Sequence, residues 1–277
     1  MSRAAARERS IDSLQNPAVK RARALERDRD LRERERAFVA WGLHLAQEAL
    51  RTRAPLQQIF ITPAVAGSGE GRELLRRLGG TGAAIVRTTS RVLESIAEGS
   101  GDQGILLLCS RPILEPNALL RPGTSLVVAL HGVQDPGNVG SIMRSCLALG
   151  VSGLIALPGC SDPFGSRAVR AGMGAQFSLP VAAARIRPFL DLLGPARLQL
   201  VAADRRARNT PPEVELSLPT VLLLGSEAAG LPDDLLGAAQ RRVRIPMARG
   251  VESLNVHAAA ATLLYEAARQ RDFRYRS

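Results

Sequence analysis

Polar side chains able to position a ligand and a hydroxyl nucleophile gather in three short loops of the C-terminal half. Each loop follows an apolar run and is marked by Gly or Pro; the candidates are Asn138, Arg144, Glu227, Ser253 and Asn255. Amide, guanidinium, carboxylate and hydroxyl groups together can orient an adenosine-like ligand and stabilise developing negative charge on an attacking oxygen. This chemistry requires no metal ion.

Other chemistries lack their residue patterns. None of the three loops carries the G-x-G-x-x-G of a dinucleotide site, and there is no P-loop or G-x-S-x-G nucleophile elbow. Paired carboxylates for glycoside hydrolysis are missing, because Asp135 and Glu227 stand alone in their loops. The histidines and cysteines lie too far apart for a metal site; they are His44, His131, His257, Cys109, Cys146 and Cys160.

The loops are expected to share one edge of a parallel sheet. Apolar runs predict strands at 125–130, 153–157, 177–182, 198–202, 220–224 and 242–245, with helices between most of them. Helices are predicted at about 141–149 and 233–240, and an Ala-rich helix follows Asn255. An α/β sheet of this kind binds ligands at the carboxyl ends of its strands.

The N-terminal part divides into an arm and a small domain. Residues 1–36 are predicted to form a charged helical arm, with Asn16 as an N-cap before Pro17. Residues 37–110 read as a smaller α/β domain, with strands at 58–61, 83–86 and 104–109 and helices at 43–50, 70–78 and 90–97. A Pro-marked linker covers 111–123, and the C-terminal domain covers 124–277.

Composition indicates the kind of partner. The formal charge is +11 and the isoelectric point about 11.1, which favours a nucleic-acid ligand. Lys20 is the only lysine, so arginine carries nearly all of this charge. There is no apolar run of membrane-spanning length and no signal peptide, and three scattered cysteines fit a reducing cytoplasm.

Three segments resemble the motifs of a known family. DPGNVGSIMRSC, LLLGSEAAGLP and RIPMARGVESLNV look like motifs one, two and three of the SpoU/TrmH family of RNA ribose 2′-O-methyltransferases. They occur in the family's order, and the resemblance covers about Leu126 to Arg269. The N-terminal part resembles the ribosomal-protein-like substrate-binding domain joined to this family's ribosomal RNA enzymes, with ITPAV and GDQGILLL as cues.

The resemblance implies a fold, a cofactor and an assembly. The parallel sheet would carry a deep trefoil knot, the cofactor would be S-adenosylmethionine, and the enzyme would be a cytoplasmic homodimer. The alanines 258–261 would permit close helix approach at the subunit interface. The residues expected to bind the cofactor are Leu224, Gly225, Gly230, Ile245, Met247 and Leu254.

The resemblance also assigns catalytic roles. Arg144 matches the family's catalytic arginine, but a guanidinium with a pKa above about 12 is a poor base, so a role in holding the adjacent phosphate is preferred. Asn138 would orient Arg144 or the ribose, and Glu227 would pair with an arginine. Ser253 and Asn255 would hold the third loop and the nucleotide; alternatively, the amides and Ser253 are only helix caps. His131 is the rival base.

Two positions depart from the family pattern, and three readings of the target stay open. Gly172 stands where the family usually has Ser or Thr, and His257 where a small residue is commoner, which fits a packing role. Structured ribosomal RNA is the expected substrate because of the appended N-terminal domain. The alternatives are a transfer RNA methylase and a non-catalytic RNA-binding protein that retains the knot.

Overall fold

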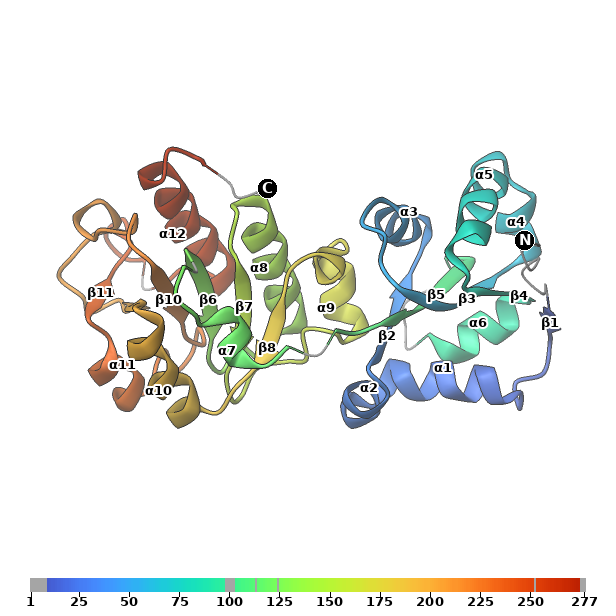
Figure 1. The fold of residues 1–277 in the computed structure, drawn as a ribbon, viewed down its shortest axis with the longest axis horizontal. Coiled ribbons are helices and arrows are strands. Elements are labelled where there is room, and N and C mark those ends of the chain that lie inside the picture. Colours follow the sequence, from blue (N-terminus) through green and yellow to red (C-terminus); the bar gives the residue numbers. More distant parts are fainter. Residues whose placement is uncertain (1–8, 98–102, 113, 124, 252, 275–277) are drawn as a thin grey trace. The chain divides into compact units, whose positions relative to one another are not determined.

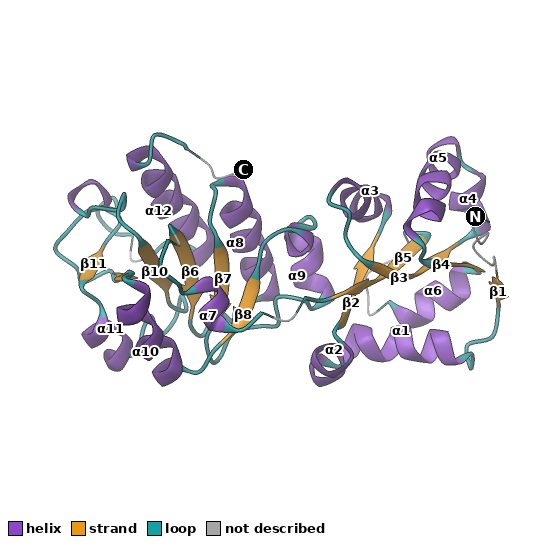
Figure 2. Cartoon of the chain, in the orientation of Figure 1, coloured by secondary structure: helices purple, strands orange, loops and turns teal. Residues whose placement is uncertain are grey.

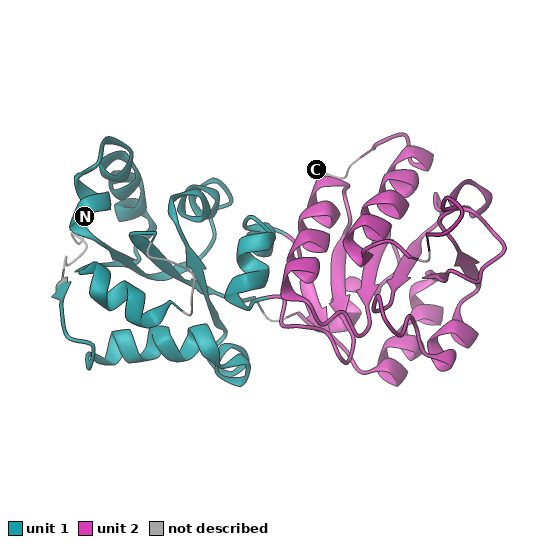
Figure 3. Cartoon of the chain, turned by 180° about the vertical axis from the view of Figure 1, so that it is seen from behind, with its two compact units in different colours: residues 1–112, 164–178 teal, residues 113–163, 179–277 magenta. Residues whose placement is uncertain are grey.

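A computed structural model describes residues 9–97, 103–112, 114–123, 125–251 and 253–274 (Figure 1, Figure 2). The chain divides into two compact units, which Figure 3 shows in different colours. Unit 1 comprises residues 1–112 and 164–178, and unit 2 comprises residues 113–163 and 179–277. None of the helices in the described ranges combines the length and the apolar character needed to cross a membrane.

Unit 2 is built on a parallel sheet, as the sequence predicts. Six strands lie in the order β11-β9-β10-β6-β7-β8, and every neighbouring pair is parallel. Their bounds are β6 Leu126–Leu130, β7 Gly153–Ala156, β8 Val181–Ala183, β9 Gln199–Ala203, β10 Thr220–Leu224 and β11 Arg241–Val243. Strands β6, β7 and β10 are buried along their whole length, which is typical of parallel strands covered on both faces.

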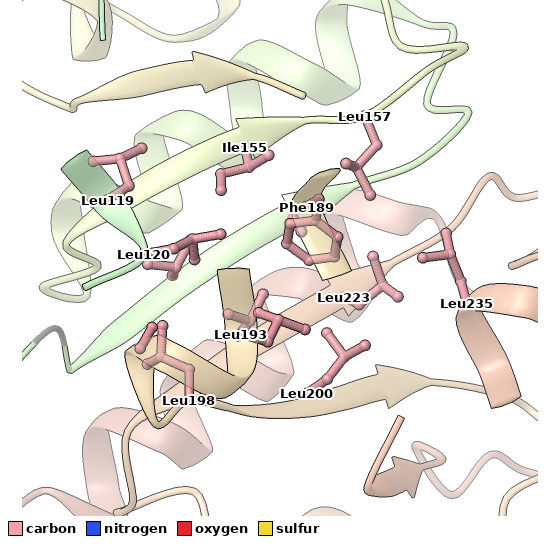
Figure 4. Packing of buried hydrophobic residues seen from close by; sticks show 14 of the residues in the cluster. Leu119, Leu120, Ile155, Leu157, Phe189, Leu193, Leu198, Leu200, Leu223 and Leu235 are labelled. Carbon is pink, nitrogen blue, oxygen red and sulfur yellow. The ribbon is translucent and has the colours of Figure 1, made fainter. Parts of the chain in front are cut away.

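Helices cover both faces of this sheet. They are α7 (Pro116–Leu119), α8 (Pro136–Ala148), α10 (Ile186–Ala196), α11 (Asp233–Ala238) and α12 (Val256–Gln270), with a 3-10 turn at Pro211–Glu213. On one face, residues of α7, α10 and α11 pack around the fully buried Phe189 and the strand residues Leu200 and Leu223 (Figure 4). Helices α8 and α12 pack against each other on the opposite face (Figure 1).

The order in which successive strands are added to the sheet reverses between β6 and β10, although the two strands are parallel. From β6 the chain steps outward to β7 and then β8, whereas β10, β9 and β11 lie on the other side of β6. At such a reversal, the loops that follow the two neighbouring strands run to opposite sides of the sheet and leave a crevice between them. Open α/β sheets bind their ligands in this crevice, at the carboxyl ends of the strands. The loops after Leu130 and Leu224 flank this point, because these two residues are register partners.

Unit 1 contains a five-stranded mixed sheet in the order β1-β4-β3-β5-β2, with β5 antiparallel to both of its neighbours. The strands are β1 Arg9–Ile11, β2 Ala37–Trp41, β3 Leu56–Ile61, β4 Ala84–Thr88 and β5 Ile105–Ser110. The helices are α1 Pro17–Arg27, α2 Arg29–Glu35, α3 Leu43–Arg51, α4 Pro63–Gly67, α5 Gly69–Leu78, α6 Ser90–Ile96 and α9 Ser166–Ala171, with 3-10 turns at Gly79–Thr81 and Ala175–Phe177.

The structure differs from the expected boundaries in two places. Residues 9–36 do not form a separate arm: Val19 and Leu25 of α1 are fully buried against the sheet of unit 1. Residues 1–8 lie outside the described residues. The sequence predicts that residues 164–178 are part of the C-terminal domain, but they belong to unit 1, where the Phe38 ring packs against Phe164 and Phe177 with centroids 5.2 and 5.9 Å away.

Several elements also differ from the sequence-based expectation. Helix α8 begins at Pro136 rather than near residue 141, because Asp135 caps it and Pro136 takes its first position. The strand expected at 177–182 is a 3-10 turn ending at Phe177, followed by the short β8. Strand β11 ends at Val243, so Ile245 lies in the following loop. The N-cap at Asn16 is confirmed, since its side chain accepts a hydrogen bond from Ala18 N.

Candidate active site

The first loop holds Asn138 in the opening turn of α8. Asp135 Oδ1 accepts a hydrogen bond of 2.8 Å from the Asn138 backbone N–H, and Pro136 needs no partner for its nitrogen. Because Asp135 provides the cap, the Asn138 side chain is free to reach another loop. Asn138 is therefore not a helix cap, which removes one of the alternatives that the sequence left open.

Three side chains from the three loops meet in one hydrogen-bonded network. Asn138 Nδ2 donates to Glu227 Oε1 at 2.8 Å. Asn255 Nδ2 lies 2.8 Å from the same oxygen and 3.0 Å from Asn138 Oδ1. The Val256 backbone N–H also donates to Glu227 Oε1, at 3.2 Å. These contacts, over separations of 28 to 117 residues, confirm that the three strand-end loops converge.

Glu227 is the acceptor that organises this network. Its carboxylate receives two amide N–H groups and the first backbone N–H of α12, where the helix dipole favours negative charge. The expectation that Glu227 pairs with an arginine is wrong among the described residues, because amides of the other two loops take that place. Asn255 has two roles, since its Oδ1 also caps α12 by accepting from His257 N at 2.9 Å.

A cavity of about 320 Å³ lies beside the network, at the carboxyl ends of the strands. Its lining includes four of the six residues expected to bind the cofactor, namely Gly230, Ile245, Met247 and Leu254, together with Glu227 and Ser253. The volume is at the lower end of the range for small-molecule sites. Apolar side chains from the third loop and Leu263 of α12 provide walls for a flat, partly apolar ligand.

The other two expected cofactor residues, Leu224 and Gly225, do not line this cavity. Leu224 is buried at the end of β10, where its carbonyl accepts from His131 N at 2.9 Å. A Cβ on Gly225 would come within 2.4 Å of the Gly230 carbonyl carbon, so only glycine lets the 225–231 loop fold back so closely. Gly225 therefore shapes the loop that lines the cavity.

Arg144 makes no hydrogen bond to the network in the described part of the chain. Its side chain is exposed on α8, does not line the cavity, and has no hydrogen-bond or ion-pair partner among the described residues. The neighbouring Ser145 lies with its Oγ 3.1 Å from His257 Nε2, which joins α8 to the start of α12. His131 is half-buried, and its Nδ1 has no hydrogen-bond partner within the described part of the chain.

A fourth loop, which the motifs in the sequence do not indicate, also lines the cavity. Asp204, Arg205 and Arg206 follow β9 directly and line the same cavity. Their position after a predicted parallel strand was the available signal, because all parallel strands end at one edge of the sheet. Charged residues after a strand are also typical of a solvated loop, so residue type alone does not mark them as part of a site.

Neither a metal cluster nor a reactive cysteine accompanies the site among the described residues. No three or more His, Cys, Asp or Glu side chains gather there as metal ligands would. Burial raises the pKa of the Cys146 thiol of α8 far above its ordinary value, so this thiol remains protonated. The polar groups at this edge of the sheet include the network of Asn138, Glu227 and Asn255 and the charged side chains of residues 204–206.

Gly172 has a packing explanation in the structure. It ends α9, where a Cβ would lie 2.8 Å from Gln176 Oε1 and 3.1 Å from the Ala168 carbonyl oxygen. A Ser or Thr at this position would have to displace the buried Gln176 side chain. The glycine therefore matches the conformation of residues 172–176 in unit 1.

Comparisons with known proteins assign both parts of the chain. Residues 125–265 match the SpoU rRNA Methylase family, and residues 16–107 match the MRM3-like substrate binding domain. The chain is 30% identical over 262 residues to an uncharacterized tRNA/rRNA methyltransferase of Synechocystis sp., covering 94% of each. It is 26% identical over 257 residues to the 23S rRNA (guanosine(2553)-2′-O)-methyltransferase RlmP of Bacillus subtilis, covering 93% of this chain and 98% of that one.

Solved structures agree along almost the whole chain. An AdoMet-bound rRNA methyltransferase from Sinorhizobium meliloti matches with a TM-score of 0.83 and 31% identity, over 95% of this chain and 98% of that one. The SpoU methyltransferase AviRb from Streptomyces viridochromogenes, in complex with AdoMet, matches with a TM-score of 0.85 and 28% identity, over 95% and 100%. With its three motif loops joined at one sheet edge, the chain belongs to the SpoU rRNA methylase family.

Proposed function

We propose that this protein is an S-adenosylmethionine-dependent methyltransferase that methylates a ribose 2′-hydroxyl in ribosomal RNA. The observation that carries the proposal is the joining of Asn138, Glu227 and Asn255 beside the cavity, in a chain of the SpoU family. The substrate-binding domain match at residues 16–107 and the likeness to RlmP support ribosomal RNA as the target.

The cavity suits the cofactor by its lining. Ile245, Met247 and Leu254 provide apolar surface for the adenosine ring, while Ser226 and Glu227 provide polar groups at the rim. When bound there, S-adenosylmethionine supplies an electrophilic methyl group. Gly225 and Gly230 keep the 225–231 loop folded back on itself, so the wall formed by Ser226 to Leu231 retains its shape.

The chain's own residues must orient the nucleophile and favour loss of its proton. A ribose hydroxyl is a weak nucleophile until its proton is shared, so the site has to stabilise developing negative charge on oxygen. We assign Arg144 to the phosphate next to the reacting ribose, where its fixed positive charge lowers the pKa of the hydroxyl. Asn138 and Asn255, held by Glu227, orient the ribose and its nucleotide, and Ser253 contributes a hydroxyl from the cavity wall.

Three further properties belong to this proposal. A trefoil knot is supported by membership of the SpoU rRNA Methylase family, to which the resemblance of the three motifs assigns it. A homodimer is supported by exposed apolar side chains on the paired helices α8 and α12, Leu147 (39% exposed) and Tyr265 (56%). A cytoplasmic location is supported by three buried, unpaired cysteines at positions 109, 146 and 160.

The proposal is tested by incubating the protein with methyl-labelled S-adenosylmethionine and deproteinised total RNA from the native host lacking the protein. Label in ribosomal RNA, absent when Arg144→Ala replaces the parent, is the expected result. Label confined to transfer RNA would refute the ribosomal assignment and identify a transfer RNA methylase. RNA that binds the protein but acquires no label would refute the enzymatic role and favour a binding protein.

A further inference from the structure

A second concave surface of unit 2 lies next to the cofactor cavity. It is a groove of about 480 Å³ between the loop that follows β9 and strand β11, here called the β11 groove. Four arginines and two aspartates line it; the arginines are Arg206, Arg208, Arg241 and Arg242. Arg206 and Asp204 line both the groove and the cofactor cavity, so the two spaces adjoin.

The groove has a fixed backbone frame. Asp204 N donates to the Val243 carbonyl at 2.9 Å, and Arg244 N donates to the Asn209 carbonyl at 2.9 Å. Asn209 thereby forms a parallel bridge to Val243 on the outer side of β11. Charged residues on an exposed edge strand often prevent that strand from pairing with another chain. The edge at β11 is already covered by residues 204–209, so the arginines are not needed for this protection.

The arginines of the groove differ in how far their charge is compensated. Arg242 is held in place, since its Nε donates to the Leu236 carbonyl at 3.1 Å and its Nη1 lies 3.8 Å from Asp204 Oδ2. Among the described residues, the Arg241 guanidinium donates only to a backbone carbonyl, that of Gln240, at 3.0 Å. The exposed guanidinium groups of Arg206 and Arg208 have no hydrogen-bond or ion-pair partner in the described ranges of the chain.

We propose that the β11 groove binds the phosphodiester backbone of the substrate RNA, with Arg208 and Arg241 as phosphate contacts. Two facts favour RNA phosphate: the planar guanidinium fork matches phosphate oxygens, and the groove carries a surplus of positive charge over its two aspartates. Because the groove and the cofactor cavity share Asp204 and Arg206 in their linings, a phosphate bound in the groove would lie next to the cavity. The inference rests on the proposed function, because it assigns the groove to that enzyme's substrate.

The test compares Arg208→Ala, Arg241→Ala and the double variant with Arg187→Ala. Arg187 is a matched control, since it is an 85% exposed arginine of the same unit, on α10, and its removal subtracts the same charge. Binding of deproteinised ribosomal RNA and of a short oligouridine is measured by fluorescence anisotropy across a salt series. Affinity for S-adenosylmethionine is measured by calorimetry on the same samples.

Each groove substitution is expected to reduce the slope of log affinity against log salt by about 0.7 to 0.9, and affinity near physiological salt by about fivefold. The affinity of the groove variants for S-adenosylmethionine is expected to equal that of the parent. The salt slope of RNA binding by Arg187→Ala is also expected to equal the parental slope. The inference is overturned by parental slopes in both groove variants, by an equal change in Arg187→Ala, or by loss of cofactor affinity with RNA affinity intact. If the parent methylates no RNA but the slopes change as stated, the proposed function fails and the RNA groove is supported.

Discussion

Replacement of Glu227 tests how the site is organised. The carboxylate accepts three hydrogen bonds through one oxygen, from Asn138 Nδ2, Asn255 Nδ2 and Val256 N. Each hydrogen bond contributes about 1 kcal/mol net, so Glu227→Ala removes about 3 kcal/mol of the free energy that holds the Asn138 and Asn255 amides and the start of α12 in place. Since 1.4 kcal/mol corresponds to a factor of ten, methyl transfer is expected to fall by about two orders of magnitude.

Glu227→Gln separates charge from shape. A glutamine can present an acceptor oxygen to the same three donors, but neutral hydrogen bonds are about half as strong as those to a carboxylate. The loss for Glu227→Gln is therefore expected to be about tenfold, between the parent and Glu227→Ala. The control is Asp191→Ala, an exposed acidic residue of α10 far along the chain from the network.

The assay is single-turnover methyl transfer to ribosomal RNA at saturating cofactor, accompanied by thermal unfolding. The unfolding temperature of Glu227→Ala is expected to fall by several degrees, at about 2–4 °C per kcal/mol, because the same three hydrogen bonds also stabilise the fold, so the assay is run well below that temperature. Full activity in Glu227→Ala would refute the reasoning. Equal losses in Glu227→Ala and Glu227→Gln would show that charge itself, rather than placement of the two amides, is the contribution of Glu227.

Three other substitutions address the remaining parts of the account. Arg144→Ala should abolish methyl transfer while calorimetry finds cofactor affinity nearly unchanged; equal loss of cofactor binding would contradict its assignment to the RNA phosphate. Gly225→Ala should lower the free energy of unfolding by about 1–3 kcal/mol and weaken cofactor binding, because its Cβ would meet the Gly230 backbone at 2.4 Å. Hydrogen bonds from Thr210 N and Oγ1 lower the pKa of the Glu213 carboxyl, so its contribution to stability is present above its ordinary pKa and is lost as pH falls through the lowered value. Thr210→Ala should move that pKa upward in an NMR titration, and an unchanged pKa would assign the effect to the backbone N–H alone.

Strand-to-loop transitions were the part of the fold that the sequence predicted well. Runs such as 221–224 are apolar throughout, and a continuous apolar run before a Gly-marked loop is typical of a buried parallel strand. Strand β2, with its AFVAW sequence, was missed because five buried residues without alternation cannot be distinguished from part of a helix by periodicity. The position of 164–178 depends on the contacts of Phe38 with Phe164 and Phe177, and such long-range contacts leave no local pattern.

The site was predictable to the level of its loops but not of its partners. The residue types and motif order identified Asn138, Glu227 and Asn255. The hydrogen bond between Asn138 and Glu227 depends on where α8 begins. Because Asp135 caps the helix, α8 begins at Pro136, about one turn before the start that apolar periodicity predicts, and Asn138 lies in its first turn. The β11 groove lay beyond the sequence analysis because its arginines come from segments 206–208 and 241–242, which only the sheet order brings together.

The central claim is that the joined loops of unit 2 direct a methyl group to a ribose oxygen of ribosomal RNA. The most direct measurement is mass spectrometry of nucleosides from host ribosomal RNA, with and without the protein, after methyl transfer in vitro. One new 2′-O-methylnucleoside is expected; it is absent with Arg144→Ala and forms about a hundredfold more slowly with Glu227→Ala. A methyl group on a base, or a 2′-O-methylnucleoside that forms at the parental rate in both variants, would contradict the claim.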